Sequence, residues 1–322
     1  MHFNQFSSLP RFFVSFRLLK RSYSMTATII DGKAIAQSVR DQVKSSIANT
    51  KQAYPQFDPR LAILLVGSRS DSTTYVKTKD KAANEVGISI EMNKLPETIS
   101  QEDLLAKIKQ FNLDDKVHGI LVQMPLPSHI NEDVVLESID YKKDVDGFHP
   151  FNIGKMCKRA GRPMFIPCTP KGIIHLIKTT GIDISGKRAV VIGRGDIVGS
   201  PVAALLTAED ATVTLCHSKT KDIERIVQEA DIVVAAAGKA ELVKGSWIKP
   251  GAIVIDVGMN AVDDPTKKSG YRWVGDVEFE KAKEVASFIT PVPGGVGPMT
   301  VAMLMENTML SAQRWLSIND SK

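Results

Sequence analysis

The sequence has few cysteines and no long apolar run. Cys157, Cys168 and Cys216 are its three cysteines, and no two of them form a C-x-x-C pair. An odd, scattered set of cysteines provides no disulfide framework and suits a reducing compartment. No stretch approaches the ~20 apolar residues of a membrane-spanning helix, so we expect no membrane partner. The six histidines show no H-x-x-x-H spacing, and we therefore predict no metal site.

Acidic residues are missing from residues 1–30, which hold four basic residues. These four account for most of the net charge of +5 and leave only +1 for the rest of the chain. A nearly neutral charge over the rest of the chain argues against a nucleic-acid partner.

An acid-free segment rich in Phe, Ser and Arg is typical of a mitochondrial transit peptide, so we predict a leader at 1–24 and a protein of the mitochondrial matrix. Met25 offers an internal start for a cytosolic form, and a disordered leader without a targeting role is the alternative.

Short apolar runs of strand length alternate with helical stretches along the remaining chain. Continuously apolar runs suit parallel strands buried on both faces, and the alternation predicts the α/β class. We expect two α/β domains flanking a cleft. The first covers 25–168 and is joined by a final helix at 298–318, and the second, at 169–297, is a Rossmann-type parallel-sheet domain that binds a dinucleotide. The expected strands lie at 61–66, 119–124, 189–192, 211–215, 232–236 and 252–257.

A glycine-rich turn follows the run at 189–192. Gly193, Gly195 and Gly199 form a G-x-G-x-x-x-G pattern between a strand and a helix, and such glycines let a pyrophosphate approach a helix N-terminus. An NAD site usually places an acid at the end of the second strand, but residues 216–220 contain none. Arg194 and Ser218 would instead receive a 2′-phosphate, which favours NADP over NAD. A solvated loop charge is the alternative for Arg194.

Tyr75 and Lys79 lie four residues apart on a predicted helix that is capped by residues 70–74 and ends at Gly87, so they share a face. That helix carries further lysines, and a solvated charged face is the alternative.

Gln123 closes the strand at 119–124, at the edge where open α/β sheets bind ligands. An amide that satisfies the following turn is the alternative.

Asp144 and Asp146 precede Gly147. Their spacing alone favours a pair of turn carboxylates.

Residues 291–298 form the stretch richest in glycine and proline. Six of its eight residues are Gly or Pro, and none is charged. Proline fixes φ, and glycine permits close backbone approach, so we expect a stiff loop whose backbone presses against a neighbour. It lacks the Lys-Ser/Thr pair of a phosphate loop. A rigid turn before the last helix is the alternative.

Seven segments, in order and spanning about 30 to 316, resemble the bifunctional methylenetetrahydrofolate dehydrogenase/methenyltetrahydrofolate cyclohydrolase family. With the leader, they look most like the mitochondrial dehydrogenase/cyclohydrolase portion of a C1-tetrahydrofolate synthase. Such longer proteins add a formate–tetrahydrofolate ligase domain. The segments are Tyr75-Val76-Lys77-Thr78-Lys79, Val122-Gln123-Met124-Pro125-Leu126-Pro127, Lys143-Asp144-Val145-Asp146-Gly147, Phe165-Ile166-Pro167-Cys168-Thr169-Pro170, Gly193-Arg194, Cys216-His217-Ser218-Lys219-Thr220 and residues 291–300.

The resemblance implies a role for particular residues. Lys79 looks like the catalytic lysine, Gln123 like the amide that orients it, and Asp146 like the carboxylate that grips the pterin. Tyr75 looks like the aromatic that stacks on the folate. Further substrate contacts are implied for Val122, Met124, Pro293, Gly294, Gly295, Val296 and Gly297, and NADP contacts for Gly193, Arg194, Gly195 and Ser218.

The implied partners are one-carbon derivatives of tetrahydrofolate, NADP and a second copy of the chain in a homodimer. The sequence departs from the family where Gly195-Asp196 replaces a common Ser-Lys pair, which places a carboxylate near the phosphates. A dehydrogenase with weak cyclohydrolase activity or NAD preference is therefore the close alternative. A catalytically silent dinucleotide-binding or RNA-associating module is the alternative from another class.

Overall fold

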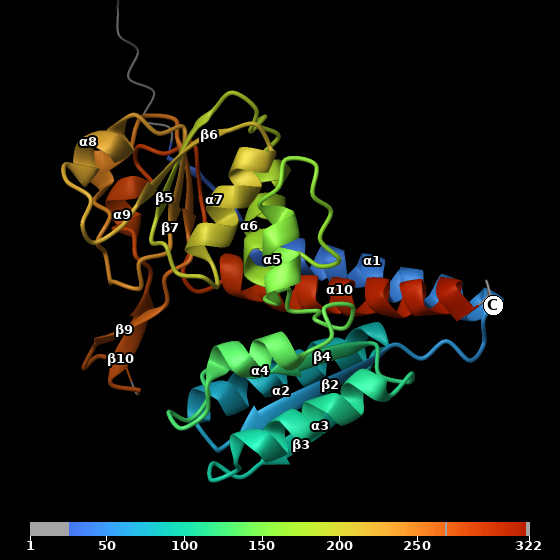
Figure 1. Ribbon diagram of the computed structural model, residues 1–322. Coiled ribbons are helices and arrows are strands. Elements are labelled where there is room, and N and C mark those ends of the chain that lie inside the picture. The colour runs from blue at the N-terminus through green and yellow to red at the C-terminus, as the bar shows by residue number, and fades with distance from the viewer. Residues whose placement is uncertain (1–25, 268, 320–322) are drawn as a thin grey trace, which may run out of the picture.

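A computed structural model describes residues 26–267 and 269–319. The leader predicted at 1–24 lies outside the described residues. Two parallel sheets are separated by a pair of long helices, α1 (Gly32–Ala53) and α10 (Val296–Asn319) (Figure 1). Neither these helices nor any other in the described part of the chain is long and apolar enough to cross a membrane.

The smaller sheet has three parallel strands in the order β3-β2-β4. The apolar runs predicted at 61–66 and 119–124 form β2 and β4, and both are buried. The edge strand β3 was not predicted, because polar residues interrupt it and it is only half-buried. The elements of this part are β2 (Arg60–Val66), α2 (Ser70–Val86), β3 (Ser89–Leu95), α3 (Gln101–Leu113), β4 (Gly119–Val122) and α4 (Glu132–Ser138).

The larger sheet has six strands in the order β1-β11-β8-β7-β5-β6, all parallel. Its four predicted runs are confirmed as the strands β5, β6, β7 and β8, but β6 lies at the edge of the sheet and is largely exposed rather than buried. The strands are β1 (Thr28–Ile29), β5 (Arg188–Ile192), β6 (Thr212–Cys216), β7 (Ile232–Ala235), β8 (Ile253–Asp256) and β11 (Phe288–Ile289).

Helices cover both faces of the larger sheet, and a two-stranded ribbon projects from its domain (Figure 1). The ribbon consists of β9 and β10, which pair with each other antiparallel. The remaining elements are α5 (Pro150–Met156), α6 (Cys168–Thr179), α7 (Gly199–Ala208), α8 (Ile223–Gln228), a 3-10 helix (Gly245–Trp247), β9 (Asn260–Asp263), β10 (Tyr271–Val274) and α9 (Phe279–Ala282).

Two local features differ from the expectations. The first domain was predicted to start at residue 25, but β1 pairs with β11 and forms an exposed edge strand of the larger sheet. Near the predicted domain boundary, α5 begins at Pro150 after a side-chain cap from His149. Helix α2 does end at Gly87 in the left-handed conformation, but its N-cap position is Arg69, whose side chain does not cap the helix.

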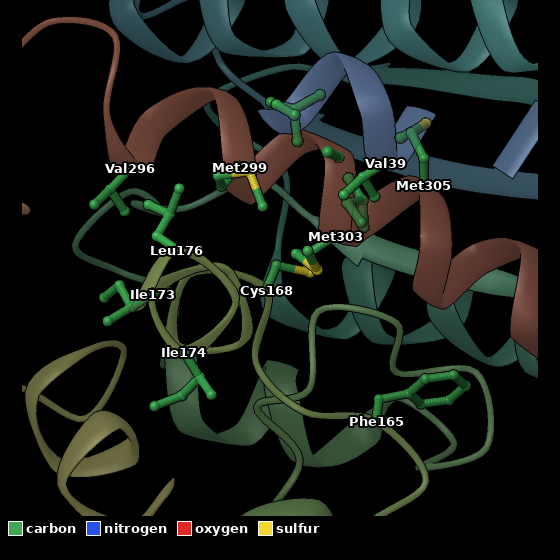
Figure 2. Close-up of a cluster of buried hydrophobic side chains, with 14 of the residues drawn as sticks. Val39, Phe165, Cys168, Ile173, Ile174, Leu176, Val296, Met299, Met303 and Met305 are labelled. Carbon is green, nitrogen blue, oxygen red and sulfur yellow. The ribbon is translucent and has the colours of Figure 1, made fainter. Parts of the chain in front are cut away.

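Helices α1 and α10 run side by side and parallel (Figure 1), and α10 contacts α6 as well as α2, β2 and β4. The two helices approach closely where Gly32 of α1 meets Gly295, just before α10, and farther along Gln313 donates to Ser46 and Thr50. Helix α10 also packs against α6, where Cys168, Met299 and Met303 gather in one apolar cluster (Figure 2). A single helix therefore fixes the smaller sheet relative to the larger one.

Candidate active site

Lys79 lies on the buried face of α2, with only 6% of its surface exposed. Its Nζ donates a hydrogen bond of 2.9 Å to Oε1 of Gln123, directly after β4. Tyr75, one turn earlier on the same helix, is half-exposed, and its ring centroid is 6.0 Å from the same Nζ. A solvated charged face is therefore the wrong interpretation for Lys79, because that side chain points into the protein.

The amide of Gln123 is held at both ends. Its Nε2 donates 2.8 Å to the carbonyl of Met124, while its Oε1 accepts from Lys79. The backbone N–H of Gln123 continues the sheet by donating to Leu64 of β2. Val122, the last residue of β4, is buried beneath it. The end of a rigid strand thus sets the position of the lysine.

Asp146 lies at the same end of the sheet. The segment that precedes it runs parallel to β4, with Ile120 bridged to Asp144. Asp144 uses its carboxylate on the backbone N–H groups of Gly147, Phe148 and His149, so the turn interpretation is confirmed for this residue.

The charges of Asp146 and Lys79 act on each other across this site. Burial lowers the pKa of the Lys79 ammonium, and the Asp146 carboxylate partly offsets that effect. Burial likewise raises the pKa of Asp146, and Lys79 opposes it. Burial favours the neutral form of both groups, so Lys79 releases its proton more readily than an exposed lysine does.

Cys168, at the start of α6, is a buried member of this cluster for which the motifs indicated no role. Its thiol bonds to the Asp146 side chain and thereby lowers the pKa of that carboxyl. Burial, followed by the charge of Asp146, raises the pKa of Cys168 well above its ordinary value, so the thiol stays protonated. The only available signal was its position in the Pro-Cys-Thr-Pro segment.

The glycine-rich turn follows β5 and lies beside the end of β6. Gly193 has a φ of +112°, and a Cβ there would lie 2.0 Å from the Ala236 carbonyl oxygen. Gly199 is equally constrained, by the carbonyl of Gly193. A Cβ on Gly195, by contrast, would meet nothing within 4 Å. Gly193 and Gly199 therefore build the turn, whereas Gly195 leaves the outer surface of the turn open.

Arg194 and Ser218 are exposed at the ends of neighbouring strands. Gly193 donates 2.9 Å to the carbonyl of Cys216, which brings the two segments together. The turn leads directly into α7, whose N-terminal N–H groups attract anions. This arrangement fits a dinucleotide that carries a 2′-phosphate.

Asp276, which the sequence analysis did not identify, orders another loop at this edge of the sheet. It is fully buried and accepts backbone hydrogen bonds from Ala237, Gly238 and Lys239, directly after β7. Three donors aimed at one carboxylate fix that loop beside the glycine-rich turn. Only a tertiary contact reveals this, because Asp276 follows β10 in the chain.

The Pro/Gly loop approaches α1. A Cβ on Gly32 would lie 1.9 Å from the carbonyl oxygen of Gly295, and Gly294 faces the stem of Lys33. The expectation that the loop presses its backbone on a neighbour is confirmed. Val292 and Pro293 are joined by a cis peptide bond, and α10 begins at Val296. Pro293 and Gly297 are exposed, whereas Gly295 and Val296 are buried.

No group of three or more His, Cys, Asp or Glu that could hold a metal ion occurs within residues 26–267 and 269–319. The polar groups gathered at Lys79 are a lysine, an amide, a carboxyl and a thiol. The nucleotide-binding type of sheet and the buried lysine cluster together define a two-domain α/β enzyme of the dinucleotide-dependent class.

Comparison with known families identifies the branch of that class. Residues 30–146 match the tetrahydrofolate dehydrogenase/cyclohydrolase catalytic domain, and residues 167–316 match the NAD(P)-binding domain of the same family. The chain belongs to the tetrahydrofolate dehydrogenase/cyclohydrolase family.

Relatives and solved structures agree with this assignment. Bifunctional protein FolD 2 of Arabidopsis thaliana is 57% identical, over 90% of this chain and 96% of that protein. The cytoplasmic C-1-tetrahydrofolate synthase of Schizosaccharomyces pombe is 54% identical, over 90% of this chain but 31% of the synthase. The Trypanosoma brucei methylenetetrahydrofolate dehydrogenase-cyclohydrolase, solved with NADP and an inhibitor, has a TM-score of 0.86 and 46% identity over 90% of this chain and 98% of that one.

Proposed function

We propose that this chain oxidises 5,10-methylenetetrahydrofolate to the 5,10-methenyl form with NADP and hydrolyses that product to 10-formyltetrahydrofolate, in one-carbon metabolism. The observation that carries the proposal is the buried Lys79, bonded to Gln123 and facing the charge of Asp146. The second reaction needs a group that both takes up and releases a proton, and a lysine with a lowered pKa supplies it. The bifunctional names of the relatives support both steps.

The residues of the larger domain fit NADP. Gly193 and Gly199 build the turn, Gly195 leaves it open to a pyrophosphate, and Arg194 and Ser218 would receive the 2′-phosphate. NADP, when bound, accepts the hydride that leaves the one-carbon bridge. The protein's part in this first step is to hold the two rings in register.

The smaller domain and the Pro/Gly loop supply the substrate contacts. Tyr75 stacks on the folate, Asp146 binds the amino edge of the pterin, and residues 293–297 form a wall of the site, with Val122 and Met124 beside Gln123. In the hydrolysis, the neutral Lys79 amine accepts a proton from the attacking water. The resulting ammonium then returns a proton as the ring opens. Gln123 keeps Nζ in one place through both transfers.

The decisive test replaces Lys79 with Gln. Hydrolysis should fall by on the order of 10²-fold or more, while hydride transfer falls less, because only hydrolysis needs the proton shuttle. Lys77→Gln is the matched control, since Lys77 is an exposed lysine on the same helix. Equal retention of both activities in Lys79→Gln would remove this residue from the mechanism.

The close alternative, a dehydrogenase with weak cyclohydrolase activity or NAD preference, is tested by the same assay. Wild-type protein receives 5,10-methylenetetrahydrofolate with NADP or NAD at matched concentrations, and both absorbing products are followed. Faster turnover with NADP, together with formation of 10-formyltetrahydrofolate, supports the proposal. Accumulation of the methenyl product or faster turnover with NAD supports the alternative.

A homodimer is part of the proposal. Within the described residues, β9 and β10 pair only with each other, and an isolated two-stranded ribbon is marginally stable in water. Tyr271 and Trp273 on this ribbon are each 39% exposed. We expect the wild-type protein to have the mass of two chains by light scattering and Trp273→Glu the mass of one. A wild-type monomer would refute the dimer.

Import into the mitochondrial matrix is also part of the proposal, supported by the acid-free, Arg-containing segment at 1–24. Relatives carry cytoplasmic, mitochondrial and chloroplastic names. The likeness to a mitochondrial C1-tetrahydrofolate synthase rests on this leader, because FolD proteins and synthases match at similar identity. Import of the full chain into isolated mitochondria, compared with a version starting at Met25, tests it; equal exclusion of both would contradict it.

A further inference from the structure

Asn307 lies in the interior of α10 with only 1% of its surface exposed. Its Nδ2 donates 2.9 Å to the carbonyl of Val145 and 3.1 Å to the carbonyl of Ile166. The same nitrogen is 3.6 Å from Sγ of Cys168. A buried amide requires a full set of hydrogen-bond partners, and Asn307 finds them on two segments of the smaller domain.

Lys171 fixes which way this amide points. Its Nζ donates 2.7 Å to Oδ1 of Asn307 and forms an ion pair of 2.6 Å with Glu306. A lysine has donors only, so the amide oxygen must face it and the NH₂ group must face the two carbonyls. The orientation of Asn307 is therefore determined by α6, one turn after Cys168.

Both carbonyls belong to segments that build the site. Val145 directly precedes Asp146, and Ile166 lies two residues before Cys168. Sγ of Cys168 is in turn 3.4 Å from the Val145 carbonyl. The Asn307 side chain thus links the two chain segments that carry the Asp146 carboxyl and the Cys168 thiol beside Lys79.

We propose that Asn307 is a positioning residue that holds Asp146 against Lys79 through the Val145 carbonyl. It touches neither substrate nor cofactor and acts only through the backbone that precedes Asp146. Because α10 begins at the Pro/Gly loop, the same helix fixes that loop and Asp146 relative to each other. The inference rests on the proposed function, in which Lys79 moves protons and Asp146 binds the pterin.

The test compares Asn307→Leu with Ser311→Ala. Ser311 lies one turn later on α10, is equally buried and also donates to backbone carbonyls, those of His118 and Lys142. It therefore matches Asn307 in burial and in bonding to backbone carbonyls, but its shorter bond, of 2.5 Å, goes to His118 and it does not bond to Val145. Unfolding in urea is measured for both variants, so that loss of stability is separated from loss of positioning.

Asn307→Leu should raise the KM for methylenetetrahydrofolate and lower kcat/KM for hydrolysis by on the order of 10- to 100-fold, as small displacements of catalytic groups do. The Asp146 charge raises the pKa of Lys79, so a displaced carboxylate lets that pKa fall. In the pH profile of hydrolysis, the inflection that is due to Lys79 is the one absent from Lys79→Gln. This inflection should accordingly move to lower pH in Asn307→Leu. Ser311→Ala should keep the wild-type KM and pH profile.

Lys171→Met gives a second, milder variant, since Lys171 is partly exposed and its loss frees the amide to turn without removing it. It should shift the same inflection in the same direction. If Asn307→Leu does not fold, Lys171→Met provides the test. A shifted pH profile of hydrolysis supports the proposal, and an unchanged pH profile overturns it. If both variants fold and keep wild-type KM and profile, Asn307 has no positioning role. A wild-type protein that lacks both activities would refute the proposed function instead.

Discussion

Nζ of Lys79 and Oε1 of Gln123 lie 2.9 Å apart, joined across 44 residues of sequence. The lysine comes from the middle of α2 and the amide from the end of β4, so the bond exists only when the helix packs on the sheet. It leaves the ammonium with a neutral acceptor and the opposing Asp146 charge close by. The protonation of Lys79 is therefore set by very few groups, each of which can be changed separately.

Replacing Gln123 with Glu should convert Lys79 from a base into a permanent ammonium at neutral pH. A carboxylate at hydrogen-bond distance favours the charged lysine and raises its pKa. Hydrolysis at pH 7 should fall by on the order of 10²-fold and recover as the pH rises. Gln123→Met is the control, because it removes the acceptor without adding charge. Identical pH profiles for the two variants would contradict this account.

Two glycines of the nucleotide turn should respond differently to a methyl group. Gly193→Ala places a Cβ 2.0 Å from the Ala236 carbonyl at a positive φ, so we expect a less stable protein and loss of NADP binding. Gly195→Ala meets no protein atom within 4 Å and should unfold like the wild type. A raised KM for NADP in Gly195→Ala would show that the phosphates approach this backbone. An unchanged KM would place them elsewhere.

Arg194 should determine the preference for NADP. Arg194→Gln removes the charge that receives the 2′-phosphate, and the ratio of kcat/KM for NADP over NAD should fall by on the order of 10- to 100-fold, the cost of a charge-assisted pair. Arg225→Gln is a suitable control, because Arg225 is exposed on α8 of the same domain. If both variants keep the wild-type ratio, another group reads the 2′-phosphate.

His118 should make the protein sensitive to acid. Burial lowers its pKa to about 4, and the charge of Lys143 contributes. Its Nδ1 accepts a hydrogen bond from the backbone N–H of Arg60, which a protonated ring cannot do. The folded pKa lies below the unfolded value near 6.5, so this residue adds stability above that value and loses it as the pH falls towards 4.

The measurement is the free energy of urea unfolding between pH 4 and 7 for the wild type and His118→Asn, which keeps an acceptor but does not titrate. The decrease below pH 6.5 should be smaller in His118→Asn. Asp144 and Asp256, whose pKa values burial raises to about 7, act with the opposite sign and remain in both proteins. Parallel curves for the two proteins would exclude His118 as a source of acid lability.

The sequence by itself determined the elements that local pattern controls. Continuous apolar runs identified β2, β4, β5 and β7 because strands buried on both faces need no polar residues. Gly87 identified the end of α2, and the four-residue spacing placed Tyr75 and Lys79 on one face. Specific motifs, compared with a known family, also indicated the activity and most of the site.

Only the tertiary structure decided which of these residues meet. The two-residue β1 has no detectable pattern and is defined by its pairing with β11. The burial of Lys79 depends on what covers α2, and the cluster with Cys168 depends on where α6 begins. Asn307, 162 residues from Val145, has no local signal at all. Desolvation and charge coupling depend on distances through space, and the order of residues along the chain does not contain these distances until the helices have packed on the sheets.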